Sequence, residues 1–310
     1  MMNRIRNRRS RYASFGLAAV FILILSLVSC EKEVHINLSN GESQLVVQGV
    51  IETGLPPYVI LSKSIGYSPT VDLSTLANTY VHGAVISVSD GSRTVKLREY
   101  QIDSVVQNVS YSFYIYSVDS SDPTSFSFVG QLEHYYTLNI AFEGKTYTST
   151  TKIPNPKPLD SLWAEKTDTV NTPNIRVVWF KYTDPDTLGN SFRYFTSTNG
   201  GPFYPWINSV FNDDIINGST VSYRMNLGYD HSKNPDFDSV GKARVGDTVV
   251  IKWCAIDKGV YNFYNTLEYS TGTVGSPFVS PVNVKTNILG GALGIWAGYG
   301  TTYKSIVIPL

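Results

Sequence analysis

"AVISVSDGSRTVKLRE", residues 84–99, decides the fold class, because it spells two strands and the turn that joins them. Before the turn, Ile86 and Val88 alternate with serines, and valine and leucine alternate with basic residues after it. A period of two is the pattern of a strand that buries one face. Asp90-Gly91 provides the left-handed backbone that a tight hairpin turn needs. The stretch therefore predicts a β-hairpin.

A second hairpin is predicted by "YYTLNIAFEGKTYTST", residues 135–150, in which a Glu-Gly pair turns the chain. The segments 44–51 and 58–64 have the same strand character and flank a turn rich in Gly and Pro. Short strands at regular spacing, with turn residues between them, are typical of a β-sandwich. We therefore expect residues 44–152 to form an N-terminal immunoglobulin-like or transthyretin-like β-sandwich domain.

A boundary is predicted at "KIPNPKPLDS", residues 152–161, because closely spaced prolines make a stiff, extended connector. Strand patterns resume in segments 174–182 and 246–253. The 21 tyrosines, the 14 phenylalanines and the many β-branched residues favour strands over helices. We expect an all-β protein in which residues 153–310 form a second, β-rich domain.

One short helix is expected in the second domain, near residues 257–269. Val260, Tyr264 and Leu267 recur there at helical spacing, and Asp257 precedes them as a capping residue.

The first thirty residues have the pattern of an export signal. Five arginines and no acidic residue precede an apolar run from Ala13 to Val28, which is too short for a membrane span of roughly 20 residues. The run ends in Leu-Val-Ser-Cys, which resembles a bacterial lipobox and predicts a signal peptide over 1–29 with lipid attached to Cys30. An ordinary signal peptide, with Cys30 present by chance, is the alternative.

The segment 30–43 is polar and predicts a tether between the lipid and the first strand. Glu31-Lys32-Glu33 resembles an acidic signal that sends lipoproteins to the cell surface, and a solvated tether with incidental charges is the alternative. The expected location is the outer membrane, with the lipid-anchored chain facing outward.

Removal of residues 1–29 would take five of the 25 basic residues and none of the 25 acidic ones, which leaves a formal charge of −5. This acidity argues against a nucleic-acid partner, which requires a basic patch. Cys254 lies in a β-branched run and is expected to be a small buried hydrophobe rather than a nucleophile.

Sequence motifs for catalysis or metal binding are absent. There is no Gly-x-Ser-x-Gly elbow, and the four histidines are not spaced as a zinc pair. Residues 184–195 begin like a calcium loop but carry Leu188 and Phe195 where oxygen ligands are needed. The same segment and residues 234–238 are expected to form Asx turns rather than Ca²⁺ sites. We expect no catalytic residues, no metal and no cofactor.

The best candidate contact surface is "NGGPFYPWIN", residues 199–208, a loop that carries Phe203, Tyr204 and Trp206. Exposed aromatic side chains of this kind serve to stack on a glycan or to anchor a peptide or protein partner. The alternative is that they fold back over the core of their own domain.

Several stretches, taken together, resemble the Bacteroidota lipoprotein family catalogued as domain of unknown function 4249 (DUF4249). They occur in order over the expected mature chain: "CEKEVHINLSNGESQLVVQGVIETGLPPYVILSKS", "YTLNIAFEGKTYTSTTKIPNPKPLDSLW", "DPDTLGNSFRYF", "VFNDDIINGS" and "SPFVSPVNVKTNILGGALGIWAGYG". The resemblance implies a role beside TonB-dependent outer-membrane receptors, and it carries no catalytic residues. The last stretch is expected to be structural, because its glycines allow close backbone approach and Asn287 can satisfy backbone groups.

The sequence thus favours a non-enzymatic surface lipoprotein that is an accessory or ligand-capturing subunit of a TonB-dependent transporter. A surface-tethered glycan- or peptide-processing enzyme and an adhesin-like structural module are the alternatives.

Overall fold

The structure is a computed structural model that describes residues 43–65, 73–106, 109–167, 173–236, 238–274 and 282–310. Strands make up 49% and helices 9% of it, which confirms the all-β class. The predicted leader, Cys30 and the tether up to residue 42 lie outside the described residues. Within the described ranges, no helix is long and apolar enough to cross a membrane.

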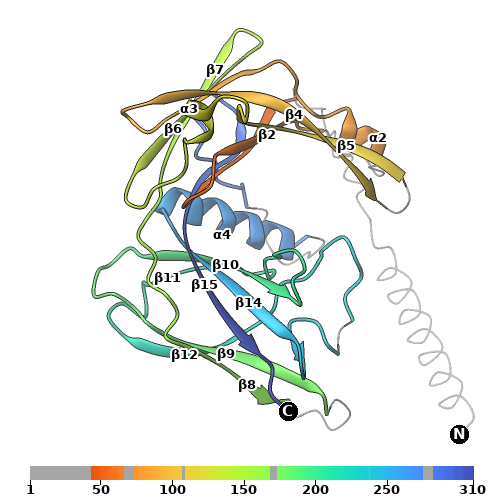
Figure 1. Cartoon of the computed structure of the whole chain (residues 1–310), viewed down its shortest axis with the longest axis vertical. Coiled ribbons are helices and arrows are strands. Elements are labelled where there is room, and N and C mark those ends of the chain that lie inside the picture. The colour runs from red at the N-terminus through yellow and green to blue at the C-terminus, as the bar shows by residue number, and fades with distance from the viewer. Residues whose placement is uncertain (1–42, 66–72, 107–108, 168–172, 237, 275–281) are drawn as a thin grey trace, which may run out of the picture. The chain divides into compact units, whose positions relative to one another are not determined.

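Two sheets contain the described strands (Figure 1). The larger sheet has eleven strands in the order β11 (Val210–Asn212), β10 (Ser191–Thr198), β14 (Thr248–Ile256), β15 (Leu293–Val307), β1 (Leu45–Glu52), β2 (Tyr58–Lys63), β5 (Val109–Val118), β4 (Thr94–Val106), β3 (Val85–Ser89), β6 (Tyr135–Phe142) and β7 (Lys145–Lys152). The smaller sheet contains β12 (Thr220–Met225), β9 (Ile175–Thr183), β13 (Ala243–Arg244) and, on the other edge of β9, β8 (Ser161–Lys166).

Both predicted hairpins are confirmed. In the first, Ile86 pairs with Leu97 and Val88 with Val95, and all four side chains are buried. In the second, β6 and β7 pair over their whole length across a Glu-Gly turn.

The predicted helix is confirmed as α4 (Lys258–Gly272). Asp257 caps it by accepting a hydrogen bond from the Val260 amide at 2.9 Å. The second carboxylate oxygen of Asp257 accepts from Thr151 Oγ1 at 2.6 Å and from the Lys152 amide at 3.0 Å, so the cap also ties the helix to the end of β7. Two shorter helices, α2 (Leu73–Ala77) and α3 (Pro123–Phe126), have only five and four residues and were not expected.

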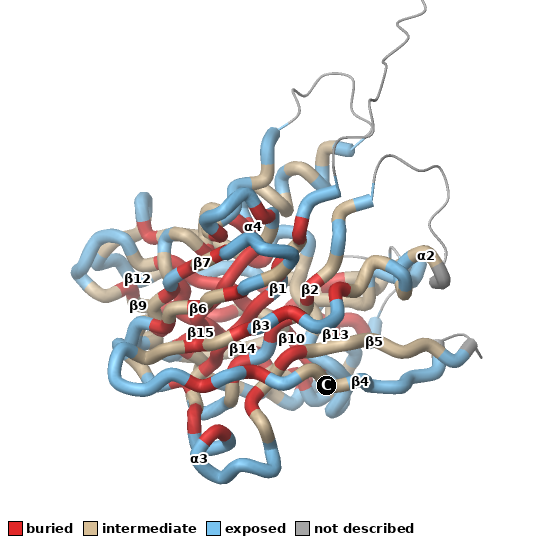
Figure 2. Tube along the Cα trace, turned by 90° about the horizontal axis from the view of Figure 1, so that it is seen from above, coloured by how far each residue is buried: buried red, intermediate tan, exposed pale blue. Residues whose placement is uncertain are grey.

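The larger sheet joins the two halves of the chain. The expected boundary at residues 152–153 falls at the end of β7, but β15, near the C-terminus, pairs in parallel with β1 from Val46↔Leu293 to Glu52↔Tyr299. The described residues between 43 and 310 form one compact unit. Buried residues are concentrated along β1, β15 and their neighbours (Figure 2).

The glycine-rich half of β15 is packed against backbone on more than one side. A Cβ on Gly298 would lie 2.4 Å from the Lys152 carbonyl oxygen, and a Cβ on Gly300 would lie 1.9 Å from that of Pro154. Trp296, which precedes Gly298 in the same strand, is fully buried, and its indole N–H donates to the Tyr136 carbonyl at 2.9 Å. Only glycine allows strands to approach this closely.

Asn287 secures the start of this segment. Its side-chain amide donates to the Trp296 carbonyl at 2.8 Å, and its oxygen accepts from the Trp296 amide at 2.9 Å. The side chain therefore occupies the place of a neighbouring strand, which is the structural role expected for this motif.

We predict that Gly298→Ala will lower the free energy of unfolding by about 2 kcal/mol, because the added methyl group has to displace the backbone at residue 152. Gly272→Ala, at the open end of α4, is the matched control and should leave stability unchanged or raise it by up to about 1 kcal/mol. Urea unfolding followed by tryptophan fluorescence measures both. Equal stability of the Gly298 variant and the unmodified chain would contradict the close packing.

Candidate functional site

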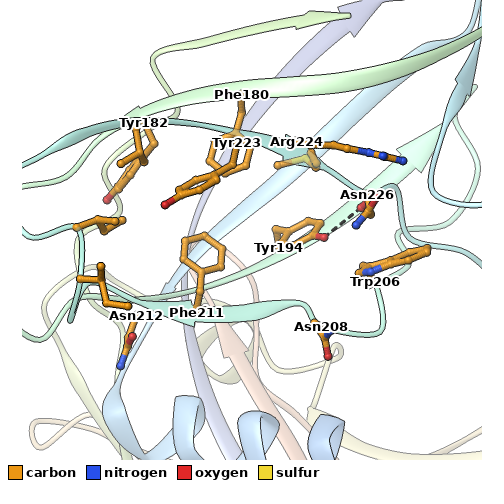
Figure 3. Close-up of a pocket in the computed structure, with 14 residues that line it drawn as sticks. Phe180, Tyr182, Tyr194, Trp206, Asn208, Phe211, Asn212, Tyr223, Arg224 and Asn226 are labelled. Atoms are coloured by element: carbon orange, nitrogen blue, oxygen red, sulfur yellow. Dashed lines mark hydrogen bonds between the residues drawn. The ribbon is translucent and has the colours of Figure 1, made fainter. Parts of the chain in front are cut away.

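An aromatic pocket of about 480 Å³ lies between the two sheets in the C-terminal half of the chain (Figure 3). One wall comes from β9 and β12, and the other from β10, β11 and the loop between β10 and β11. Its lining contains Phe180, Tyr182, Tyr194, Trp206, Asn208, Phe211, Asn212, Ile215, Ile216, Val221, Tyr223, Arg224, Met225 and Asn226.

Alternate side chains of the paired strands β9 and β12 form the first wall. On β9, Phe180 and Tyr182 point into the space between the sheets and are buried. On β12, Tyr223 lies opposite Phe180 in register, with the ring centroids 6.2 Å apart. Tyr223 is 51% exposed, so its ring stands between the core and the solvent.

The second wall contains Tyr194 and Phe211. The Tyr194 hydroxyl donates to the Asn226 carbonyl at 3.1 Å, which ties β10 to the end of β12 across the pocket. The Phe211 ring lies 5.0 Å from that of Trp253, a fully buried residue of β14. The walls are therefore backed by packed aromatic side chains and are held in a fixed geometry.

Trp206 lines the pocket between the two walls. It is half-buried, packs on the hydrophobic core of the C-terminal half, and lies 5.6 Å from the Tyr229 ring. Gly241 has a φ of +75° and would bring a Cβ to 3.1 Å from the indole, so this glycine makes room for the tryptophan.

The structure separates the other two predicted contact residues from Trp206. Phe203 is 40% exposed and packs against Tyr303 of β15, with the ring centroids 5.9 Å apart. Tyr204 forms backbone hydrogen bonds with Thr196 in both directions, at 3.0 and 2.9 Å. Neither belongs to the pocket lining. Ligand contact by the three residues stays a prediction, and the geometry favours Trp206.

Sequence reasoning did not find the rings of the two walls. These residues belong to strands whose alternation was visible, such as Phe180 and Tyr182 in "VVWFKY". The pattern marks them as inward-facing, but it does not say that the two sheets leave a space between them.

A buried polar network fixes the loop that carries Trp206. Arg193 of β10 donates from Nε to Ser209 Oγ at 3.1 Å and from Nη1 to the Tyr299 hydroxyl of β15 at 2.9 Å. Its guanidinium also lies 3.3 Å from the ring centroid of Tyr264 on α4. Glu268 of α4 accepts from the Ser209 amide at 2.8 Å and from its hydroxyl at 2.5 Å.

Burial dominates the electrostatics of this network. Desolvation raises the pKa of Glu268, although the hydrogen bonds from Ser209 and the charge of Arg193 act in the opposite direction. A buried arginine held by hydroxyl groups and an aromatic face serves here as a brace between β10, β15 and α4.

The family of the chain is settled by a family model described as "Domain of unknown function (DUF4249)", which matches residues 31–305. The chain belongs to the DUF4249 family. A comparison with curated proteins gave no match.

In this DUF4249 chain, residues 184–190 and 212–219 pack against each other beside the pocket. Asp213 is fully buried and accepts hydrogen bonds from the amides of Gly189 at 3.1 Å and Asn190 at 2.9 Å. Asp184 is also buried and accepts from the Gly218 amide at 3.3 Å, and burial raises the pKa of Asp184. These carboxylates connect two loops rather than forming the simple Asx turn expected for the first one.

Metal ligation has no candidate group in the part of the chain that the structure describes, where no three His, Cys, Asp or Glu side chains cluster suitably. His82 pairs with Glu99, His134 with the Leu132 carbonyl, and the His231 ring with that of Tyr229. These three histidines thus have separate local partners.

Cys254 is buried, as the sequence indicates, and burial raises the pKa of its thiol to about 12. The reactive thiolate is therefore scarce at neutral pH.

We predict that native Cys254 will resist alkylation by iodoacetamide at pH 8 and will react after unfolding in urea. The full chain carrying Cys30→Ser isolates this thiol, because only two cysteines occur in the sequence. Mass spectrometry counts the alkylated groups. Rapid labelling of the folded protein would show that β14 opens readily at this position.

Proposed function

We propose that the chain is a lipid-anchored outer-membrane protein that captures a small ligand at the cell surface for a TonB-dependent β-barrel transporter. The aromatic pocket between the two sheets is the observation that carries the proposal. Its volume of about 480 Å³ lies within the range of roughly 300–1,000 Å³ that is usual for small-molecule sites.

Anchoring is supported by the leader and by Cys30. Each buried CH₂ of an acyl chain contributes about 0.8 kcal/mol, so several chains on Cys30 would hold the protein permanently. A tether of residues 31–43 spans at most about 45 Å when fully extended. The pocket would therefore remain within reach of a barrel in the same membrane.

Capture rather than catalysis is supported by the chemistry of the lining. Its described side chains are aromatic, aliphatic and amide groups together with Arg224, and none is a Ser, Cys, His, Asp or Glu that could act as nucleophile or general base. Burial raises the pKa of the Tyr182 and Tyr194 hydroxyls, so these phenols stay protonated at neutral pH. Such a lining suits binding better than nucleophilic catalysis.

The anchor is tested by Cys30→Ser. We expect the native chain to begin at an acylated Cys30 and to be cut by protease added to intact cells. The variant should carry no acyl mass and should stay protected from the protease. An unmodified Cys30 thiol in the native chain would refute the lipid anchor.

Ligand capture is tested by Trp206→Ala, with Phe203→Ala as the matched control on the same loop. Full-length protein is purified from membranes in mild detergent, and co-purifying small molecules and proteins are identified by mass spectrometry. We expect a β-barrel partner with every variant, and a small molecule that is lost with Trp206→Ala but retained with Phe203→Ala.

Other outcomes point to the other classes. Turnover of an added glycan or peptide by the purified chain would indicate a tethered enzyme. A chain with neither a barrel partner nor a small molecule would favour an adhesin-like module and contradict capture.

A further inference from the structure

The pocket interior is almost free of charge. Among its described lining residues, Arg224 alone carries a formal charge at neutral pH. On β12, Tyr223 and Met225 pair with Phe180 and Val178 of β9, which face inward. Arg224 lies between them in the strand, so its side chain leaves the backbone on the opposite face of the sheet. Its exposed guanidinium extends away from the ring cluster (Figure 3). A charged group placed among the rings would therefore be buried without a partner, at a cost of several kcal/mol.

The shape of the pocket selects a ring. One wall contributes the rings of Phe180, Tyr182 and Tyr223, and the facing wall contributes those of Tyr194 and Phe211 (Figure 3). A flat or cyclic body between these walls can meet aromatic faces and edges on both sides. Each such ring contact contributes about 0.5–1.5 kcal/mol beyond the burial of its area.

The polar groups available to such a ligand are limited in number. The hydroxyls of Tyr182 and Tyr223 belong to the lining and can each pair with one ligand group. The Tyr194 hydroxyl already donates to the Asn226 carbonyl. The amides of Asn208 and Asn212 point away from the ring cluster in Figure 3, and the Asn212 amide donates to Asp214 at 2.6 Å. The Trp206 indole and the Asn226 side chain lie next to each other at one end of the pocket. A free sugar carries more hydroxyls than these groups can pair, and each hydroxyl buried without a partner costs about 1–3 kcal/mol.

We propose that the pocket binds an uncharged, predominantly apolar small molecule built on an aromatic or alicyclic ring, with one or two hydrogen-bonding groups at one end. The inference rests on the proposed ligand capture and names its chemical class. The ring lies between the walls of β9–β12 and β10–β11, and the polar end faces Trp206 and Asn226.

Three probes separate the chemical classes. 2-Naphthamide is an uncharged ring with one polar group, 2-naphthoate is the same ring with a charge, and methyl β-D-glucopyranoside is a sugar without an aromatic group. The full chain in lipid nanodiscs is titrated with each probe by isothermal titration calorimetry. We expect saturable binding of 2-naphthamide, binding of 2-naphthoate that is at least about tenfold weaker, and no binding of the glucoside.

Variants place the binding in the pocket. Tyr223→Ala removes a half-exposed ring, so the fold should survive, and it should weaken 2-naphthamide binding about tenfold. Trp163→Ala is the matched control, because Trp163 stacks on Trp179, 6.1 Å away, at a place on the β8–β9 pair outside the pocket lining. Its affinity for 2-naphthamide should equal that of the unmodified chain.

Failure of the ligand class is distinguishable from failure of capture. Glucoside binding that depends on Tyr223, or naphthoate binding as tight as that of naphthamide, would overturn the uncharged apolar class and leave capture standing. The absence of any Tyr223-dependent binding would overturn the class as well. The proposal of ligand capture is contradicted only if, in addition, the native protein purifies without a small molecule that depends on Trp206.

Discussion

The packing of backbone against backbone along the glycine-rich half of β15 is the constraint on which the rest of the structure depends. Gly294 lies beside the Val47 carbonyl of β1. Gly298 lies beside the carbonyl of Lys152, the last residue of β7, and Gly300 beside that of Pro154. A side chain at any of these positions would push the strands apart. Because β15 also pairs with β14, one strand belongs to the sheet of both halves of the chain.

The aromatic pocket depends on this strand through two neighbours. β14 pairs with β15 and carries Trp253, against which the inner rings of the pocket pack. Tyr299 of β15 accepts a hydrogen bond from Arg193, which in turn donates to Ser209 on the loop that brings Trp206 to the pocket. The pocket walls are thus positioned by contacts that run through β15. A ligand would meet a preformed surface and would not have to order it.

Local patterns in the sequence predict the local structure well. The hairpin over residues 84–99, the capping role of Asp257 and the burial of Cys254 each follow from a few neighbouring residues, and each is confirmed. The parallel pairing of β1 with β15 joins segments about 250 residues apart, and no local pattern specifies such a partner. The sequence therefore predicts two domains in succession, whereas one sheet runs through both.

The candidate site was accessible to sequence reasoning only in part. Phe203, Tyr204 and Trp206 give the same signal, aromatic residues in a loop rich in Gly and Pro, and only the fold distinguishes them. Trp206 reaches the pocket because Gly241 leaves room for it, while Phe203 packs on Tyr303. A cavity arises from the distance between two sheets, which the composition of either sheet does not encode.

Hydrogen exchange of the native chain, followed by mass spectrometry in increasing urea, tests the central role of β15 most directly. If this strand unites the two halves, amides of the β3–β6 pair and amides of the β10–β14 pair will lose protection in the same step, together with Ile295–Gly300. Two separate steps, with one half still protected after β15 has exchanged, would contradict the account.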